Sequence, residues 1–425
     1  MSGYGSNAEW LVEDGITSKD DITAGDGAKR DTIPGKGALA TKTTCNVFHL
    51  LKECGIPVAF DDQVDDNSFV APRCTMLPYE VVVRREAHGS YLKRAPHLSK
   101  GHLFPQLVLE FFLKTSGKKW KNYVLPCDDP FMVHNREARY FDFYNPKGPN
   151  LAQTPAVPFM RLVEQEVFSR SDEANLMEEM GEIARHTFLV LERAWQIQGR
   201  RLVDFKIEFG LSPEGKLLLA DVIDNDSWRV VDTNGQYLDK QRYRDGDTLE
   251  NVAKLYRVVA DITSQFSLPR QQLVIWRGSN SDDPKIFDGT AIDQVIDFCG
   301  GRLFYFENVV CSIHKQPSLA YRTLHDLIQK VPDTVVIAYV GMSNGAGPTL
   351  SANCTVPVIT VPAGWEKFPE DVWSSLRGPS DVPVMTVLRP ANAVLAAFQI
   401  LAMRNPAIYA ALRFKQEERL TNDLV

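Results

Sequence analysis

Three short polar loops in the last third of the chain carry side chains suited to catalysis and to anion binding. Each loop follows an apolar run with the length and composition of a β-strand, and helix-length segments separate the runs. This alternation predicts a parallel sheet with helices between its strands. Ligands of such sheets bind beyond the carboxyl ends of the strands, so the loops predict a small-molecule site for a phosphorylated ligand. The runs with their loops are 273–276 with 278–282, 303–310 with 311–315, and 334–340 with 341–345.

Among these loop residues, His314 is best suited to moving a proton. The ordinary pKa of histidine lies near neutrality, so an imidazole can accept and donate a proton at physiological pH. A lone histidine in a loop is more often a surface residue. Here two flanking strand-end loops favour a site at His314 on the residues alone.

A second set of charged side chains lies on a predicted β-hairpin over residues 202–224. Residues 203–209 alternate between apolar and charged side chains, which places Asp204, Lys206 and Glu208 on one face. The return strand carries Asp221 back near Glu208. Two facing carboxylates could hold Mg²⁺ between nucleotide phosphates, because magnesium takes one or two carboxylates together with phosphate oxygens. A solvated hairpin face is the alternative.

The remaining periodicity predicts further helices and strands that position these residues. Ser171 is expected to cap the longest helix, which carries an apolar stripe. The expected helices cover 43–54 and 171–198, and the expected strands 68–71, 80–84 and 107–113.

Two other segments are open to two interpretations each. Residues 117–158 form a long excursion, whose lysine-rich start at 117–121 either binds phosphate or faces solvent. Residues 391–414 predict a helix interrupted near Pro406, and its apolar surface packs either in the core or against another subunit. A domain boundary is expected near 265–270.

Composition bounds the class of protein. The chain has 425 residues, of which 44% are hydrophobic and 24% charged, and a formal net charge of -7, typical of a globular protein with sizeable cores. The negative charge argues against non-specific nucleic-acid binding, and no apolar run is long enough for a membrane helix. Seven cysteines without a C-x-x-C pair, and a start without a signal-peptide pattern, fit a reducing compartment. We therefore expect a cytoplasmic protein without nucleic-acid or membrane partners.

Longer motifs resemble a known family of purine biosynthesis. The segments 18–25, 84–94, 202–210, 219–229 and 239–241 resemble SAICAR synthetase, and 278–282, 312–315, 341–348 and 371–377 resemble aminoimidazole ribonucleotide (AIR) carboxylase. The order of the two parts is that of the animal-type bifunctional fusion. The resemblance implies an α+β, ATP-grasp-related synthetase-like domain over 1–266. An α/β three-layer, flavodoxin-like carboxylase-like domain over 267–425 would follow it.

For the first domain, the resemblance implies an ATP-dependent ligation. The carboxylate of carboxyaminoimidazole ribonucleotide (CAIR) would be activated by phosphoryl transfer, and the amine of aspartate would then displace phosphate. Glu208 and Asp221 would bind Mg²⁺ and ATP. The candidates for holding the imidazole nucleotide or aspartate are Asp20, Lys36, Arg85, Ser90, Asp204, Arg229, Lys240 and Arg244. Arg85 and Ser90 are expected in a short loop after the strand at 80–84.

For the second domain, the resemblance implies addition of carbon dioxide to C4 of the imidazole without ATP, biotin or metal. His314 would handle the C4 proton, and Lys315 is the second catalytic candidate, which would also contact ribose and phosphate. The relatives are multi-subunit, so a homo-oligomer is expected. The candidates for holding the nucleotide are Ser279, Asp282, Ser343 and Asn344.

The chain departs from the family at three places. The first residues lack the glycine- and lysine-rich hairpin that covers the ATP phosphates in the family, so we expect either a truncated start or ATP binding that is altered or lost. Met342 stands where the family has arginine and cannot donate a hydrogen bond. Ile313 replaces a small residue, which is expected to add bulk to the pocket. Two alternatives follow: a relative repurposed for a related azole nucleotide in C-nucleoside antibiotic biosynthesis, or a silent nucleotide-binding scaffold.

Overall fold

The computed structural model divides the chain into two compact units, each described by itself. The first comprises residues 1–52, 56–267 and 414–425, and the second comprises 53–55 and 268–413. The structure describes residues 8–10, 15–24, 29–148, 157–292, 303–342 and 344–422. None of the helices in these residues is long and apolar enough to cross a membrane.

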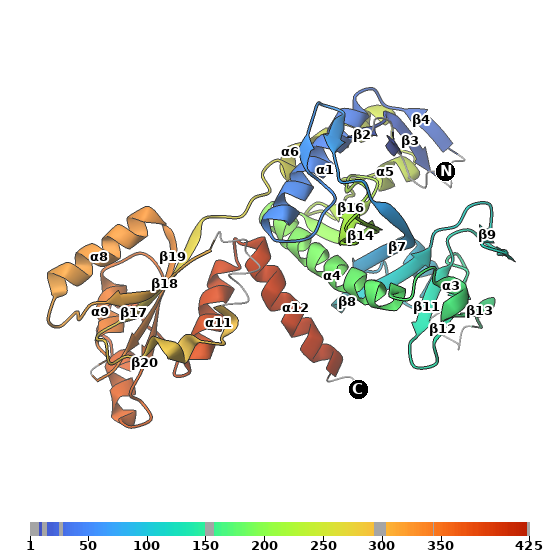
Figure 1. Cartoon of the computed structure of the whole chain (residues 1–425). Coiled ribbons are helices and arrows are strands. Elements are labelled where there is room, and N and C mark those ends of the chain that lie inside the picture. Colours follow the sequence, from blue (N-terminus) through green and yellow to red (C-terminus); the bar gives the residue numbers. More distant parts are fainter. Residues whose placement is uncertain are drawn as a thin grey trace. The chain divides into compact units, whose positions relative to one another are not determined.

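The centre of the first unit is an eight-stranded antiparallel sheet (Figure 1). Its strand order is β13-β12-β11-β8-β7-β14-β15, with β16 pairing beside β14. The predicted hairpin is confirmed, because β14 and β15 pair antiparallel with Glu208 opposite Ala220. The strands are β7 (Thr75–Glu86), β8 (Leu103–Leu113), β11 (Phe131–Asn135), β12 (Tyr140–Tyr144), β13 (Met160–Val163), β14 (Arg201–Leu211), β15 (Leu217–Ala220) and β16 (Trp228–Val231).

Smaller strands and several helices complete the first unit. The excursion after residue 117 supplies a β-hairpin and the strands β11 and β12 of the large sheet. The small strands are β1 (Ala8–Trp10), β2 (Gly15–Ser18), β3 (Asp21–Ala24), β4 (Lys29–Thr32), β5 (Asp62–Gln63), β6 (Ser68–Val70), β9 (Lys119–Trp120) and β10 (Tyr123–Val124). The helices are α1 (Lys36–Glu53), α2 (Ser90–Arg94), α3 (Glu164–Val167), α4 (Glu173–Ile197), α5 (Gln241–Arg244) and α6 (Leu249–Thr263).

Helix α4 lies across the large sheet and buries its apolar stripe against it (Figure 1). Met180, Phe188 and Leu191 of this stripe are fully buried. The predicted cap at Ser171 is wrong, because the N-cap residue is Asp172 and its side chain makes no capping bond. The Glu173 carboxylate accepts the backbone N–H groups at 169 and 170 instead, so a side chain of the first turn satisfies them.

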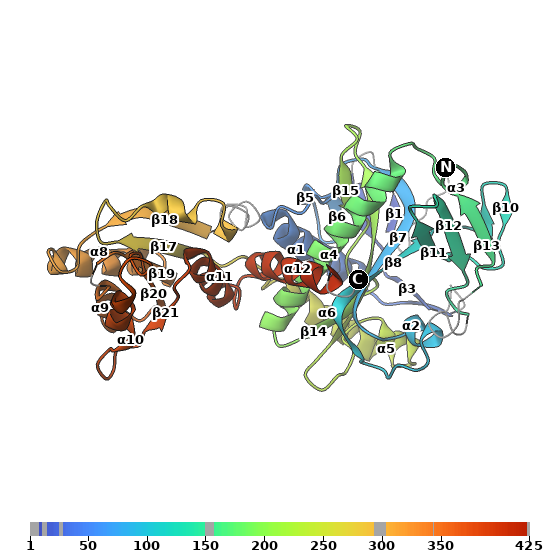
Figure 2. The same cartoon turned by 90° about the horizontal axis from the view of Figure 1, so that it is seen from below.

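The second unit is built on a parallel sheet with the order β18-β17-β19-β20-β21, visible in Figure 2. Numbered along the chain this is the order 2-1-3-4-5 of flavodoxin-like folds, whose ligands bind where the strand order reverses. That point lies between β17 and β19, and the predicted loops follow these strands. The strands are β17 (Gln271–Arg277), β18 (Leu303–Val310), β19 (Asp333–Val340), β20 (Val358–Pro362) and β21 (Met385–Thr386).

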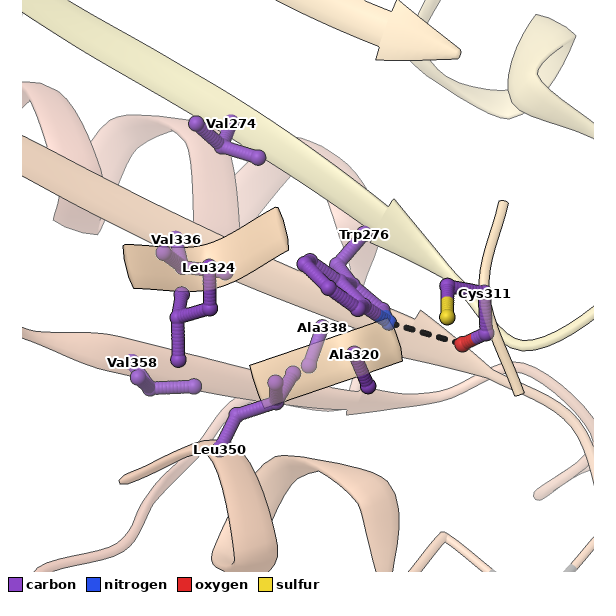
Figure 3. Packing of buried hydrophobic residues seen from close by; sticks show 9 residues of the cluster. All are labelled: Val274, Trp276, Cys311, Ala320, Leu324, Val336, Ala338, Leu350 and Val358. Atoms are coloured by element: carbon purple, nitrogen blue, oxygen red, sulfur yellow. Dashed lines mark hydrogen bonds between the residues drawn. The ribbon is translucent and has the colours of Figure 1, made fainter. Parts of the chain in front are cut away.

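Helices cover both faces of this sheet, which gives the expected three layers (Figure 1). Alternate residues of β19 serve the two faces, and Val336 and Ala338 pack with Trp276, Ala320 and Leu324 (Figure 3). The apolar side of α11 packs against β19 and β20, which supports the core interpretation of this helix. The helices are α8 (Pro317–Lys330), α9 (Ala346–Ala352), α10 (Trp373–Leu376) and α11 (Pro390–Leu401), with 3₁₀ turns η1 (Pro284–Phe287) and η2 (Pro369–Val372). Helix α12 (Pro406–Asn422) begins in this unit, and its residues from 414 onward belong to the first unit.

Candidate functional site

A polar pocket of about 140 Å³ lies in the first unit over the strands β7, β14 and β16. Charged side chains of β7 and β14 that are separated by an even number of residues share the face that lines it, as strand geometry requires. The start of α2 and the end of α5 close its sides. The lining residues are Glu80, Val82, Arg84, Ser90, Asp204, Phe205, Lys206, Asp226, Ser227, Trp228, Arg229 and Arg244.

Asp204 joins two arginines in this pocket. Its Oδ2 accepts from Arg84 Nη1 at 2.8 Å and from Arg229 Nη1 at 2.7 Å, and all three residues lie in paired strands. Arg84 Nε also donates to Glu110 Oε2 at 2.6 Å. Two guanidinium groups held in this way can grip a phosphate or carboxylate without reorganising.

Gly89 allows Arg229 to reach this position. Its φ is +58°, and an added Cβ would lie 2.4 Å from Arg229 Nη2, so any other residue would be strained and would displace the guanidinium. Ser90 follows Gly89 and lines the pocket, but it begins helix α2 and does not lie in the expected loop.

A row of carboxylates and lysines continues from the pocket along β7 and β14. Glu80 lies opposite Glu208 in the ladder, and Lys206 Nζ donates to Glu80 Oε2 at 2.9 Å. Lys114 at the end of β8 donates to Glu208. Asp221, just beyond β15, has a left-handed φ of 67°. A residue held in such a backbone conformation costs of order 1–3 kcal/mol of stability, and such residues cluster at functional sites.

Glu208 and Asp221 fit the chemistry of a divalent cation. Burial and the nearby negative charge of Asp221 raise the pKa of Glu208 to about 7, and burial also raises the pKa of Asp221. A cation between them would remove this repulsion and keep both groups ionised. Among the described residues no group of three His, Cys, Asp or Glu side chains could hold a metal ion, so phosphate oxygens would have to complete the coordination.

Two other predicted residues, Lys36 and Lys240, meet at Asp226, which lines the pocket. Lys240 Nζ donates to Asp226 Oδ2 at 2.8 Å, and Lys36 Nζ lies 3.9 Å from the same oxygen. Burial opposes ionisation of Asp226, but the two lysines outweigh it and lower the pKa of this carboxyl. Tyr256 donates to its other oxygen at 2.5 Å. The two lysines thus do not line the pocket themselves but fix the position of Asp226, which does.

Asp20 binds backbone groups of the chain itself and does not line the pocket. Its carboxylate accepts from the backbone N–H groups of Gly35 at 3.0 Å and Gly37 at 2.8 Å. It therefore fixes the turn from which Lys36 begins α1. Arg244, in contrast, lines the pocket itself.

The structure contradicts the expected loop position of Arg85. Strand β7 continues through Glu86, so Arg85 points to the face opposite Arg84. There its Nε donates to Glu192 Oε1 at 2.7 Å, and its Nη2 donates to Glu417 Oε1 at 2.6 Å. Arg84 replaces Arg85 as the substrate-binding candidate.

Sequence reasoning missed five residues of this site. The signal for two of them was present, because Glu80 and Arg84 share one face of a strand by their even spacing. Lys206 was placed on the correct face and given no role. The five residues are Glu80, Arg84, Lys114, Lys206 and Asp226.

In the second unit, Asp282 links two of the three predicted loops. Its Oδ2 accepts from the N–H groups of Gly278 and Ser279, each at 3.0 Å, and a Cβ on Gly341 would lie 3.0 Å from its Oδ1. The remaining loop, 311–315, is held by Trp276, whose Nε1 donates to the Cys311 carbonyl at 3.0 Å (Figure 3).

The remaining loop residues differ in burial. His314 and Lys315 are exposed, and a Cβ on Gly345 would lie 3.6 Å from His314 Nε2, so the second and third loops meet there. Asn344 is buried and donates to Ser375. Ser343 lies outside the described residues.

The two unusual residues of these loops are placed differently from each other. The expectation that Ile313 fills the pocket is wrong, because its side chain packs against the hydrophobic core below the loop. Met342 is 75% exposed at the end of β19, where an apolar side chain gains nothing from burial.

Two family models match the chain. The SAICAR synthetase model matches residues 13–122 and 160–261, and the AIR carboxylase model matches residues 272–422. The first match includes every residue that lines the pocket of the first unit, and the second includes the three loops of the second unit.

The chain is similar over almost its whole length to bifunctional proteins of animals. The probable multifunctional protein ADE2 of Caenorhabditis elegans is 35% identical over 421 residues, which cover 96% of this chain and 89% of that protein. The bifunctional phosphoribosylaminoimidazole carboxylase/phosphoribosylaminoimidazole succinocarboxamide synthetase of Rattus norvegicus is 34% identical, covering 94% and 87%. A solved SAICAR synthetase in complex with ADP is 27% identical, with a TM-score of 0.48, and covers 62% of this chain and 97% of that one.

Proposed function

The chain belongs to the family of bifunctional purine-biosynthesis enzymes that join a SAICAR synthetase domain to an AIR carboxylase domain, and from this premise we propose which groups carry each reaction. We assign the ATP-dependent ligation of aspartate to CAIR to residues 1–266 and carboxylase-type chemistry to residues 267–425. The observation that carries the first assignment is the pairing of Arg84 and Arg229 on Asp204, next to the carboxylate row.

The arginine pair suits the anionic groups of the imidazole nucleotide. The guanidinium group of an arginine presents several N–H donors in a fixed plane, which matches the geometry of phosphate and carboxylate groups. Ser90 and Arg244 line the same pocket and add donors for phosphate or ribose. Binding here would hold the CAIR carboxylate near Glu80 and Lys206, where the carboxylate row begins.

ATP is proposed to lie along that row, with its phosphates toward Glu208 and Asp221. A bound Mg²⁺ would neutralise charge on the transferring phosphoryl group and would be held by these two carboxylates. Lys114 and Lys206 are ion-paired with carboxylates in this row, so they are near enough to exchange those partners for phosphate oxygens.

The ligation then proceeds in two steps. A CAIR carboxylate oxygen attacks the γ-phosphorus of ATP, the bond to the β-phosphate oxygen breaks, and ADP leaves. The amine of aspartate attacks the acyl carbon of the mixed anhydride, loses a proton and expels phosphate. The protein contributes positioning and charge neutralisation.

For the second unit we propose binding of an imidazole ribonucleotide with impaired carboxylation. Ser279 and Asp282, with Ser343 and Asn344, would hold ribose and phosphate, and His314 would move the C4 proton with Lys315 beside it. Met342 supplies no hydrogen bond where an arginine would supply a charge-assisted one worth about 1.5–3 kcal/mol. No cofactor is proposed for this step.

The relatives named above are synthetases or bifunctional enzymes, so neither the repurposed homologue nor the silent scaffold gains support from them.

We also propose that the chain forms a homo-oligomer. Light scattering coupled to size exclusion gives the mass in solution. A purely monomeric mass would contradict the oligomer.

Formation of SAICAR tests the proposed ligation. Wild type, Arg229→Gln and the control Arg242→Gln are supplied with CAIR, aspartate and Mg-ATP, and the product is followed by mass spectrometry. Arg242 of α5 pairs with Asp247 beyond the end of that helix and does not line the pocket. We expect product from wild type and the control, with Arg229→Gln at least about a hundredfold slower. No product from wild type would refute the proposal.

A further inference from the structure

The ladder between β7 and β8 is interrupted directly beside the pocket. Arg84 pairs with Val108 and Glu86 pairs with Leu103, so residues 104–107 of β8 lie opposite the single residue Arg85. The backbone groups of such a bulge have no ladder partners and must be satisfied in another way when they are buried.

Side chains satisfy this bulge, and one of them comes from the far end of the chain. Arg85 Nη1 donates to the carbonyls of Phe104 at 3.2 Å and Pro105 at 3.4 Å. The N–H of Leu107 donates to Glu417 Oε2 at 2.8 Å, and Gln106 Nε2 donates to the Glu417 carbonyl at 2.8 Å. Glu417 lies in α12, whose residues from 414 onward belong to the first unit.

Glu417 also completes the surroundings of Arg85. The guanidinium lies between two carboxylates, with Glu192 Oε1 2.7 Å from Nε and Glu417 Oε1 2.6 Å from Nη2. All three residues are buried. A buried guanidinium that loses one of two carboxylates has to reorganise, and Arg85 is covalently next to Arg84.

A ring contact fixes α12 one turn earlier. Phe414 stacks on His186 of α4 with ring centroids 4.0 Å apart and an interplanar angle of 23°. Burial lowers the pKa of His186 to about 4, so the ring is neutral and suited to stacking at physiological pH. The end of α12 is thus held by a ring contact and by hydrogen bonds from Gln106 and Leu107.

We propose that the end of α12 is a working part of the synthetase site and that Glu417 is a positioning residue for it. Through Leu107 and Arg85, Glu417 fixes the β8 bulge. The bulge in turn fixes the pair of Arg84 with Val108, and with it the guanidinium that faces the pocket. The ligation therefore depends on a residue that lies within the segment matched by the AIR carboxylase model. This inference rests on the proposed function of the pocket.

The test uses the full chain with Glu417→Ala, Glu417→Gln and the control Glu418→Gln. Glu418 is the exposed neighbour on the same helix. Two quantities are measured for each protein: the KM values for CAIR and ATP in SAICAR formation, and hydrogen exchange of the β8 peptide over residues 103–109.

Glu417→Ala is expected to raise the KM for CAIR about tenfold, with the KM for ATP changed less than about twofold, because it leaves a buried N–H without a partner. The Leu107 amide should exchange at least about tenfold faster. Glu417→Gln keeps an acceptor for Leu107, so its effects should be smaller than those of alanine. Glu418→Gln should match wild type.

Two results would overturn the inference. One is an unchanged KM for CAIR together with unchanged exchange at β8. The other is a fall in kcat alone, with both KM values unchanged, because that reports a smaller folded fraction and no change of the pocket. If wild type forms no SAICAR, the proposed function fails, and the exchange of the Leu107 amide still decides whether Glu417 fixes the bulge.

Discussion

The two candidate sites are built in opposite ways. In the first unit, Asp204 is buried and bonded to both arginines that would hold substrate, and neighbouring lysines and carboxylates are paired with one another. In the second unit, His314 is exposed and Met342 is 75% exposed on loops at the end of a sheet. The first site is thus a network of paired charges, whereas the proton-transfer residue and the unusual methionine of the second site are exposed on loops.

Because of this difference, substitutions in the first site should affect both stability and activity, whereas substitutions of exposed residues in the second site should affect activity alone. A buried network needs each partner for folding as well as for binding, so a single change leaves an uncompensated charge. Exposed loop residues contribute little to folding, and their substitution usually changes stability by less than about 0.5 kcal/mol. Variants of the first site should therefore lose both properties, whereas variants at the exposed His314, Lys315 and Met342 of the second site should change only activity.

The largest effect is expected for Asp204→Asn. The change leaves the buried guanidinium of Arg84 and the partly exposed guanidinium of Arg229 without their shared carboxylate, which costs about 3–5 kcal/mol of stability. SAICAR formation should fall about a thousandfold or more, since both arginines lose their position. Calorimetric unfolding and product formation measure the two effects. The control Asp261→Asn breaks a surface pair with Lys42, and its stability should change by at most about 1 kcal/mol. A stable, active Asp204→Asn would abolish the contrast between the sites.

A gain of function is expected for Met342→Arg in the second unit. The new guanidinium could make the charge-assisted bond that methionine lacks, and carboxylation of AIR should rise about tenfold to a hundredfold. The melting temperature should not change, because position 342 is exposed. Carboxylation is followed with isotopically labelled bicarbonate. Equal rates in wild type and variant would show that the methionine does not limit the reaction.

Binding of Mg²⁺ with ATP should depend on pH in the first unit. The pKa of Glu208 is raised to about 7, so the cation must displace a proton at lower pH. Affinity should rise about tenfold per pH unit up to pH 7 and then level off. Without the cation, the contribution of Glu208 to folding is greatest below its unfolded pKa of about 4.3 and is lost as pH rises through 7. Calorimetric titration at several pH values measures the affinity, and Glu208→Gln should remove the slope. A flat profile in wild type would refute the role of Glu208.

The smallest effect on stability is expected for His314→Asn. Its exposure predicts an unfolding free energy within about 0.5 kcal/mol of wild type, whereas exchange of the C4 proton of AIR should slow about a hundredfold. NMR with AIR in D₂O follows the proton. Loss of stability without loss of exchange would mean that the loop, and not the proton transfer, needs the histidine.

Local pattern was sufficient for the strands that carry both sites. The alternation at 203–209 predicted which face Asp204, Lys206 and Glu208 share, and the apolar run at 303–310 coincides with β18. The spacing of apolar residues and the residue types of turns are local properties of the sequence, so they predict a strand without knowledge of the strands and helices that pack against it.

The positions of several side chains depend on contacts between distant segments, which the local sequence pattern does not predict. Arg84 and Arg85 are neighbours with the same side chain, and only the extension of β7 through Glu86 shows which of them faces the pocket. Ile313 was misjudged because its place depends on the helix packed below its loop. Glu417 lies 332 positions from Arg85, a separation at which no periodicity indicates a contact.

The most direct test of the ligation follows an oxygen atom from substrate to product. CAIR carrying ¹⁸O in its carboxylate is freshly prepared and mixed with aspartate and Mg-ATP, and the released phosphate is examined by mass spectrometry. Phosphoryl transfer to the carboxylate predicts that one carboxylate oxygen leaves with the phosphate, and that Arg84→Gln slows its release at least about a hundredfold. Phosphate without the label, or an Arg84→Gln enzyme as fast as wild type, would contradict ligation at this pocket.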